Sequence, residues 1–265
     1  MINFTSAQMN LWLTAFFWPF FRILALVASA PLFGAKGVPA SVKVGLSMAL
    51  TIMAAPILAP MPDIPLASAQ GLFILINQLL IGTAMGLVIR VVFSAVEMSG
   101  HIMGLQMGLG FATFFDPQNS TQIPVVGQFL GLVAMLLFLA INGHLVVIAA
   151  LVDSFSILPV SLTPLASGAW HTLVLWGNEI FRAGVLISMP VVAALMMTNI
   201  ALAILNRAAP ALNIFTVGFP LTLAIGFVAL SLAMGHFLPV FTTMIDEGVR
   251  TMLKIASQAR LPAAF

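Results

Sequence analysis

Ionisable side chains within apolar sequence are the first residues to weigh for chemistry. Glu97 and His101 are four residues apart, so on a helix they would share a face and could supply half of a metal site. No other set of Asp, His or Cys with usable spacing joins them, and the sequence contains no cysteine. We therefore expect neither a bound metal ion nor another cofactor.

A second charged pair, Glu179 and Arg182, is spaced to form an ion pair on one helix face. An ionised side chain that faces lipid at the bilayer centre costs at least ~2.5 kcal/mol. Arg22, Arg90 and Glu97 must therefore also find partners, line water or lie outside the hydrocarbon. A proton relay through Glu97 and Glu179 is one interpretation, but we favour structural pairing.

Sequence motifs of catalysis are absent. There is no G-x-S-x-G, no H-E-x-x-H and no phosphate-binding P-loop. Without cysteine, thiol nucleophiles, thiolate metal sites and disulfides are excluded. We predict that the protein is not an enzyme. An intramembrane hydrolase stays open only because a triad assembled in space leaves no sequence motif.

The composition explains why so few polar groups are available. Hydrophobic residues make up 62% of the chain and charged residues 6%, against roughly 25% charged residues in soluble domains. Its surface must therefore face lipid or a large protein assembly. The nine Lys and Arg are scattered singly, which excludes a nucleic-acid-binding patch. The N-terminal segment lacks a basic region and a cleavage site, so we expect no removed signal peptide.

Long apolar runs separated by Pro- and Gly-rich loops predict an all-α membrane-type protein. The run that begins near Gln70 has no proline until Pro117 and, if helical, would be ~60 Å long. It must either break into a hairpin near Ser94–Gly100 or form one long helix. The predicted helical runs cover about 11–30, 44–59, 70–111, 124–153, 170–206 and 216–234, followed by an amphipathic helix over about 240–259.

The distribution of Lys and Arg does not give a consistent topology. Lys36 and Lys43 place the first loop inside, and Asp63 leaves the second outside. With one crossing per run, the basic residues of the last helix then fall outside, which is the wrong side (Arg250, Lys254 and Arg260). Two explanations stay open: an odd number of crossings, or apolar runs that face protein partners instead of lipid.

Glycines recur every four residues just before the middle of the chain. Gly100, Gly104 and Gly108 form one set, and Gly82 with Gly86 forms another. On a helix they give a smooth stripe that another backbone can approach. We predict a helix-packing seam at Gly100 and Gly104, either between subunits of an assembly or within the chain. Each glycine also weakens the helix by ~1 kcal/mol, which favours bending near the end of this run.

The stretch "GLGFATFFDPQNSTQIP", residues 108–124, interrupts the apolar sequence. Asp116 is the only formal charge between Glu97 and Asp153. Pro117 disfavours a helical conformation of Asp116, and the glycines permit folding back. A non-helical segment in apolar surroundings must be buried in protein or line a water-filled cavity.

Four stretches together resemble one known family over the whole chain, the FliR/SctT family of type III export-gate components. They are "FFRILALVASAPLFGAKGVPASVK", "GLQMGLGFATFFDP", "FLAINGHLVVIAALVDSF" and "NRAAPALNIFTVGFPL". The last stretch departs from the family at Ala211, where a glutamine is usual. A role of that glutamine is therefore not carried over.

The resemblance implies a single domain over residues 1–265, built of bent hydrophobic helical hairpins. Such proteins join FliP-like and FliQ-like subunits in a helically arranged hetero-oligomeric export gate, against which an FlhB-like protein docks. The gate lies in the basal body of the bacterial flagellum at the inner membrane, and unfolded flagellar proteins pass through it. Partner subunits would then cover much of the apolar surface.

In this family the segment corresponding to about 106–123 projects into the channel as a plug. Bulky apolar side chains close a constriction sterically and by dewetting. The residues that we assign to the plug are Gly108, Gly110, Phe111, Phe114, Phe115, Asp116 and Pro117. A structural motif follows later in the chain, in which Pro210 ends one helix, Asn213 caps the next and Phe215 follows.

Two other functions remain in view. A virulence-type (injectisome) export-gate subunit would share the fold, although the Gly-Phe-Pro-Leu context favours the flagellar branch. A small-molecule secondary transporter would show broken helices and intramembrane charges, which this sequence has. It would also show two similar halves, and the sequence has no convincing internal repeat.

Overall fold

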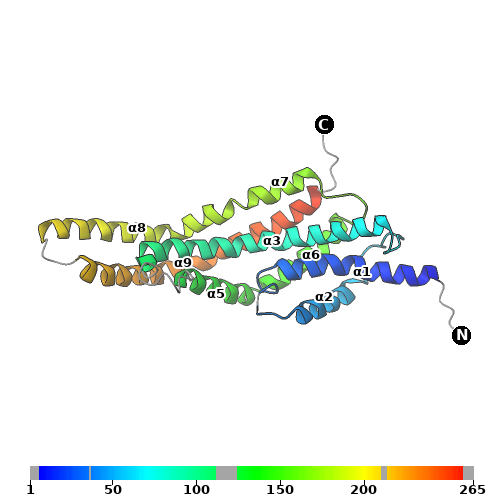
Figure 1. The fold of residues 1–265 in the computed structure, drawn as a ribbon, viewed down its shortest axis with the longest axis horizontal. Coiled ribbons are helices and arrows are strands. Elements are labelled where there is room, and N and C mark those ends of the chain that lie inside the picture. The colour runs from blue at the N-terminus through cyan, green and yellow to red at the C-terminus, as the bar shows by residue number, and fades with distance from the viewer. Residues whose placement is uncertain (1–5, 36, 112–123, 210–213, 259–265) are drawn as a thin grey trace. The chain divides into compact units, whose positions relative to one another are not determined.

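The computed structural model describes residues 6–35, 37–111, 124–209 and 214–258. These residues form helices and no strand (Figure 1), which confirms the all-α prediction. The elements in chain order are α1 Ser6–Ser29, α2 Ala40–Ala54, α3 Ala69–Gln106, the 3-10 turn η1 Leu109–Phe111, α5 Val125–Ala140, α6 Gly143–Ile157, α7 Ser167–Trp176, α8 Glu179–Ala208 and α9 Ile214–Gln258.

The chain divides into two compact units, each assembled from segments that are far apart in the sequence. Helices α3 and α9 contribute one part to each unit. Unit 1 comprises Met1–Val91, Asn142–Gly177 and Ile245–Phe265, and unit 2 comprises Val92–Ile141 and Asn178–Met244.

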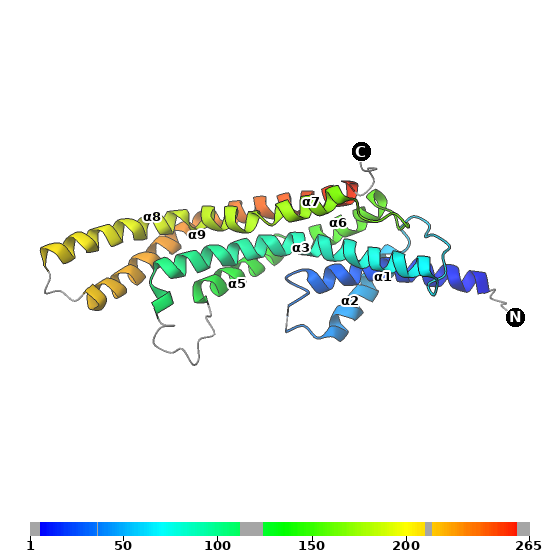
Figure 2. The same ribbon diagram turned by 45° about the horizontal axis from the view of Figure 1, so that its top comes forward.

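In unit 1, α1 lies beside the first part of α3 (Figure 2). The two helices approach closely because α3 presents glycines to α1. A Cβ atom at Gly82 would overlap the backbone carbonyl of Arg22 and the side chain of Ala25. One at Gly86 would overlap the Ser29 hydroxyl. The close approach expected along this glycine stripe is therefore present within the chain.

Helix α7 is tied into unit 1 by side-chain hydrogen bonds. The Trp176 indole N–H donates to the backbone carbonyl of Val88 on α3, at 2.9 Å. The Thr172 hydroxyl donates to Oε1 of Gln258 at the end of α9, at 2.6 Å. Both bonds join residues more than eighty positions apart, so α7 is placed by tertiary contacts and not by its short local sequence.

Helix α3 is continuous over its 38 residues, so the hairpin considered near Ser94–Gly100 is wrong and the long helix is confirmed. The buried Ser99 finds its hydrogen-bond partner within the helix. The Ser99 hydroxyl donates to the carbonyl of Val96 at 2.7 Å. Gly100 is used for packing against α5 and not for a turn.

The prediction of two helices over about 216–234 and 240–259 is also wrong, because α9 is one helix that contains Pro239. Proline removes one backbone donor. The hydroxyls of Thr242 and Thr243 both donate to the Pro239 carbonyl at 2.9 Å, one turn further on. The rings of Phe237 and Phe241 stack on each other with centroids 5.8 Å apart, and both side chains are buried. Packing of the turns that flank the proline therefore outweighs the local proline signal.

The apolar run after Pro124 is interrupted, which the sequence analysis did not anticipate. Asn142 separates α5 from α6 and has φ of 57°, in the left-handed region. Asparagine is one of the few residues other than glycine that adopt this conformation readily. The Asn-Gly pair at 142–143 therefore ends one helix and starts the next.

Four helical stretches within the described residues are long and apolar enough to cross a membrane. The helix pair α5 and α6 passes the same criterion when taken together, which gives up to five. A crossing needs about 20 apolar residues. The four stretches are Trp12–Ser29, Ala69–Gln106, Ser167–Ala208 and Gly218–Gln258.

Candidate functional site

The candidate site is the end of α3 in unit 2, where the Gly- and Phe-rich segment begins. Upstream of it, α3 crosses α5 at a pair of glycines. A Cβ atom at Gly100 would lie 2.5 Å from Cα of Gly127 and 2.7 Å from its backbone nitrogen. A Cβ at Gly104 would meet the side chains of Val126 and Leu109 at ordinary distances of 3.7 and 3.8 Å. The seam within the chain therefore requires glycine at Gly100 but not at Gly104.

Further helices of unit 2 also pack on α3. A Cβ at Gly184 of α8 would lie 3.0 Å from Cγ of Met98. The Phe93 ring meets Phe138 of α5 and Phe241 of α9 edge to face, with centroids 5.4 and 5.7 Å apart. The second part of α3 is therefore the central helix of unit 2, in contact with α5, α8 and α9.

Helix α3 ends in a left-handed turn at Gly108, which has φ of 86°. The Met107 amide still donates to the Met103 carbonyl at 2.9 Å, in the α-helical pattern. The Gly108 amide donates to Leu105 at 3.0 Å, in the tighter 3-10 pattern. Glycine adopts positive φ without the steric cost that a side chain would add. The backbone freedom predicted for Gly108 is thus used to stop the helix.

After Gly108 the turn η1 folds back along α3. A Cβ atom at Gly110 would lie 3.1 Å from Cδ2 of Leu105. One at Gly104 would lie 3.8 Å from Cδ1 of Leu109. The first residues of the segment therefore rest on the last turn of the helix that they leave.

Met107, the residue before the turn, is held against α9. Its side chain is fully buried. A Cβ at Gly226 would lie 2.6, 2.8 and 3.1 Å from its Cγ, Cε and Sδ atoms. The Thr222 hydroxyl lies 3.4 Å from the Met107 carbonyl and 3.0 Å from its local acceptor, the Phe219 carbonyl. Packing at Gly226 is therefore the stronger contact, and the Thr222 bond is long.

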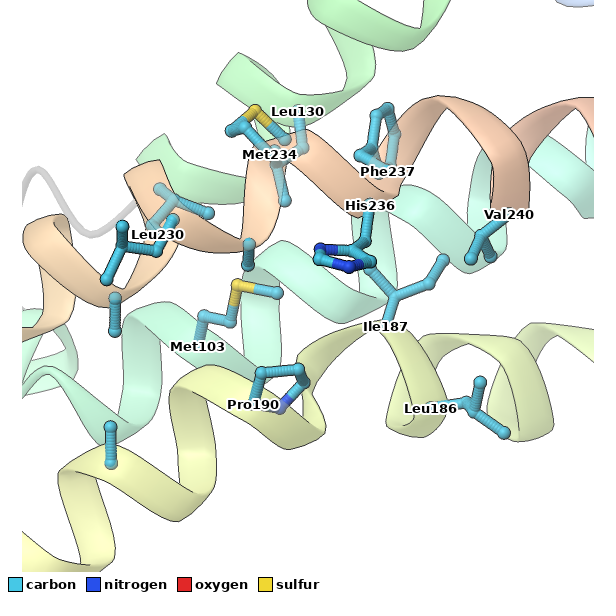
Figure 3. A pocket seen from close by; sticks show the side chains of 14 residues that line it. Met103, Leu130, Leu186, Ile187, Pro190, Leu230, Met234, His236, Phe237 and Val240 are labelled. Carbon is cyan, nitrogen blue, oxygen red and sulfur yellow. The ribbon is translucent and has the colours of Figure 1, made fainter.

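A cavity of about 520 Å³ lies next to this contact, between α3, α5, α8 and α9 of unit 2. Figure 3 shows the His236 imidazole directed from α9 toward Ile187 on α8. Met103, one turn before Met107, also lines the cavity. The cavity thus lies beside α3 one helical turn before Met107.

Unit 1 contains Arg22, the only charged residue that is buried among the described residues. Its Nε donates to Oε1 of Gln78 at 2.7 Å, and its Nη1 donates to the carbonyl and hydroxyl of Ser154, each at 3.2 Å. Its Nη2 donates to the Leu158 carbonyl at 3.0 Å, and the guanidinium lies 4.1 Å from the centroid of Phe155. The cation therefore caps the C-terminal end of α6, where helix carbonyls favour positive charge.

None of the other charged residues that the structure describes is buried. Glu179 and Arg182 form the predicted ion pair, 2.7 Å between Oε2 and Nη2, and the Arg182 side chain is 60% exposed. Arg90 and Glu97 are also exposed. Among the described residues, Arg22 is thus the charged side chain that is both buried and held by several hydrogen bonds within this chain.

The structure brings some predicted residues together and does not cover others. Gly108 and Gly110 form the turn at the end of α3, and the backbone of Phe111 completes η1. Phe215 lies in the first turn of α9. The remaining predicted residues lie outside the described part of the chain: Phe114, Phe115, Asp116, Pro117, Pro210 and Asn213.

Two glycines that complete these contacts were missed by the sequence analysis. Gly127 is the partner of Gly100, and Gly226 is the partner of Met107. Gly127 and Gly131 repeat the four-residue spacing seen in α3, which was a usable signal. Gly226 has no such companion, and its role is visible only in three dimensions.

Comparison with known proteins gives consistent matches over nearly the whole chain. Residues 13–248 match the family described as bacterial export proteins, family 1. A flagellar biosynthetic protein FliR of Pectobacterium carotovorum is 42% identical, and the alignment covers 97% of this chain and 98% of the relative. FliR of Escherichia coli K12 is 41% identical over 98% of this chain and all of the relative. FliR of Bacillus subtilis is 30% identical over 90% and 93%.

Proposed function

We propose that this member of the bacterial export proteins, family 1, closes the channel of the flagellar export apparatus. The chain is a FliR-type component of that apparatus and a multi-pass inner-membrane protein. The closing element is the segment that starts at Gly108 and carries Phe111, Phe114 and Phe115. Unfolded flagellar proteins displace this segment when they pass.

One observation carries this proposal. The central helix of unit 2 stops at Gly108, in a left-handed turn, directly before the Phe-rich sequence. The helix is thus held by its neighbours up to the point where a segment of different composition begins. Bulky apolar side chains supplied by such a segment hold back ions by dewetting and steric closure. The proposed role is mechanical and needs no catalytic residue.

The exposed apolar surface supports a role inside an assembly. Helix α8 alone exposes Phe181, Met197 and Ile204, each by more than 60%. Helices α2 and α5 expose similar residues, for example Met53 and Leu136. We propose that FliP-like and FliQ-like subunits cover much of this surface in the basal body, and that an FlhB-like protein docks on the complex. Partner contacts would also explain why the positive-inside rule fails.

The relatives named above are all flagellar proteins. This supports the flagellar branch over a virulence-type export gate. Motility of a strain that lacks its own copy tests this point directly. Complementation by this chain supports the flagellar assignment, whereas export of only virulence-type substrates would contradict it.

The channel-closing role is tested by deleting Gly110–Asn119 and measuring ion flux through the purified, reconstituted complex. We expect the complex to assemble and to leak. A matched pair of triple variants localises the effect: alanine at Phe111, Phe114 and Phe115 should leak, whereas alanine at Gln118, Asn119 and Ser120 should not. An assembled deletion complex that conducts no more than the unaltered one would show that the segment does not close the channel.

Co-purification separates the remaining alternative. A small-molecule transporter would be active as a small oligomer of this chain alone. An export-gate subunit should instead purify with FliP-like and FliQ-like subunits in stoichiometric amounts. Recovery of an active homo-oligomer without them would argue against the gate.

A further inference from the structure

We propose that Met107, seated against Gly226, is a fixed anchor for the end of α3, and that it thereby sets the point from which the channel-closing segment starts. This inference rests on the proposed function of that segment. It adds a positioning role for α9, because the contact that holds the segment's starting point lies on that helix. The anchor is expected to persist in both the closed and the open gate.

The first part of the argument is the fit of Met107 on Gly226. Both residues are buried. Cγ and Cε of Met107 lie 2.6 and 2.8 Å from the position that a Cβ at residue 226 would occupy, separations that real Cβ atoms almost never show, and its Sδ lies at a tight 3.1 Å. The methionine therefore occupies the space that is free only because residue 226 is glycine. A flexible, polarizable methionine is well suited to filling such a gap.

The second part concerns the backbone of the same residue. The carbonyls of the last helical turn have no intrahelical partner. Thr222 lies one turn before Gly226 on α9, and its hydroxyl is 3.4 Å from the Met107 carbonyl. Side chain and backbone of Met107 thus both face the same stretch of α9. This double contact defines the position of the helix end more closely than either contact alone.

The third part is the change in backbone that follows at once. Helical hydrogen bonding continues to Met107, and φ becomes positive at Gly108. Gly108 is the only glycine with positive φ among the described residues. Gly108 thus ends the helix in the left-handed conformation that is common for glycine at helix ends. The residue that Gly226 holds comes directly before this stop.

The anchor can be tested with a disulfide lock, because the chain has no cysteine of its own. A Cβ at residue 226 would be 2.6 Å from Met107 Cγ. The two Cβ atoms are therefore at most about 4.1 Å apart, within the ~3.5–4.5 Å range of disulfides. In the complete complex, Met107→Cys with Gly226→Cys should cross-link under mild oxidation, whereas each single variant should not.

The locked complex distinguishes a fixed anchor from a moving one. We expect closed-state ion flux to be unchanged and export to stay within twofold of the reduced complex. A tenfold or greater loss of export that reductant reverses would show that Met107 must leave Gly226, and would overturn the proposal. An assembled complex in which the two cysteines never cross-link would overturn it as well.

Loosening the anchor is the complementary test, with a matched control on the same helix. Gly226→Val displaces Met107, whereas a Cβ at Gly235 has no atom within 4 Å. Gly226→Val should raise closed-state ion flux at least threefold, and Gly235→Val should leave it unchanged. Adding Met107→Ala to Gly226→Val should restore part of the seal.

The anchor and the channel-closing role can fail independently of each other. If the segment deletion leaks but Gly226→Val does not, the anchor is wrong and the channel-closing role stands; if the deletion does not leak, the proposed function fails while cross-linking still tests the contact.

Discussion

Arg22→Ala should destabilise the protein strongly, although no acidic partner is lost. The substitution leaves two buried acceptors without their donor, Oε1 of Gln78 and the carbonyl of Leu158. The Ser154 carbonyl keeps a donor, the Leu158 amide, at 2.8 Å. Each unsatisfied buried group costs about 1–3 kcal/mol. Removing a buried charge recovers part of this sum, because the charge no longer has to be desolvated. We expect a net loss of about 2–4 kcal/mol.

Arg182→Ala is the matched control, since it also removes an arginine from an apolar helix. Its ion pair with Glu179 is largely exposed, and exposed pairs contribute ~0.2–1 kcal/mol. Thermal unfolding of the purified complex measures both variants. The Arg22 variant should lower Tm by on the order of 10 °C, and the Arg182 variant by at most a few degrees.

Arg22→Lys separates charge from hydrogen-bonding geometry. Lysine keeps the positive charge but cannot reproduce the planar fork that reaches four acceptor atoms. We therefore expect a Tm between those of the unaltered protein and Arg22→Ala. Equal melting of the Arg22→Ala and Arg182→Ala complexes would refute the reasoning, and full retention of Tm by Arg22→Lys would show that charge alone suffices.

Two further predictions concern glycine and asparagine positions. Gly100→Ala places a Cβ 2.5 Å from Cα of Gly127 and should lower the free energy of unfolding by ~1–3 kcal/mol. Gly45→Ala on α2, where nothing lies within 4 Å of the added Cβ, should be neutral or stabilising by ~0.5–1 kcal/mol. Equal melting temperatures of the two variants would contradict this. Asn142→Val forces a β-branched residue to φ of 57° and should lower the free energy of unfolding by ~1–3 kcal/mol. Asn142→Gly should melt at the same temperature as the unaltered complex. A valine variant as stable as the glycine variant would show that the left-handed turn is not required.

Helix content was predictable because apolar runs and proline-rich loops dominate the sequence. Prediction failed where packing overrode a local signal. Two helices were expected over about 216–234 and 240–259, yet α9 continues through Pro239, and the buried rings of Phe237 and Phe241 stack on each other. At Asn142 the reverse happened, and a single residue in the left-handed region interrupts an otherwise uniform apolar run.

The candidate site was predictable on one side only. The sequence shows that Gly108 precedes a Phe-rich segment, so the end of α3 and its backbone freedom could be foreseen. It does not show which residue stands opposite Met107, because Gly226 lies more than a hundred positions away. Arg22 was recognised as a residue that needs partners, but half of its four acceptor atoms are backbone carbonyls, and these carry no sequence signature.

The central claim is that exported polypeptide passes the segment that follows Gly108. A photo-crosslinking amino acid at Phe114 measures this directly in the assembled complex, with an export substrate stalled by a folded domain at its end. The account predicts a crosslink between position 114 and the stalled substrate, and its loss when no substrate engages the gate. Crosslinks to lipid alone, unchanged by the stalled substrate, would contradict it.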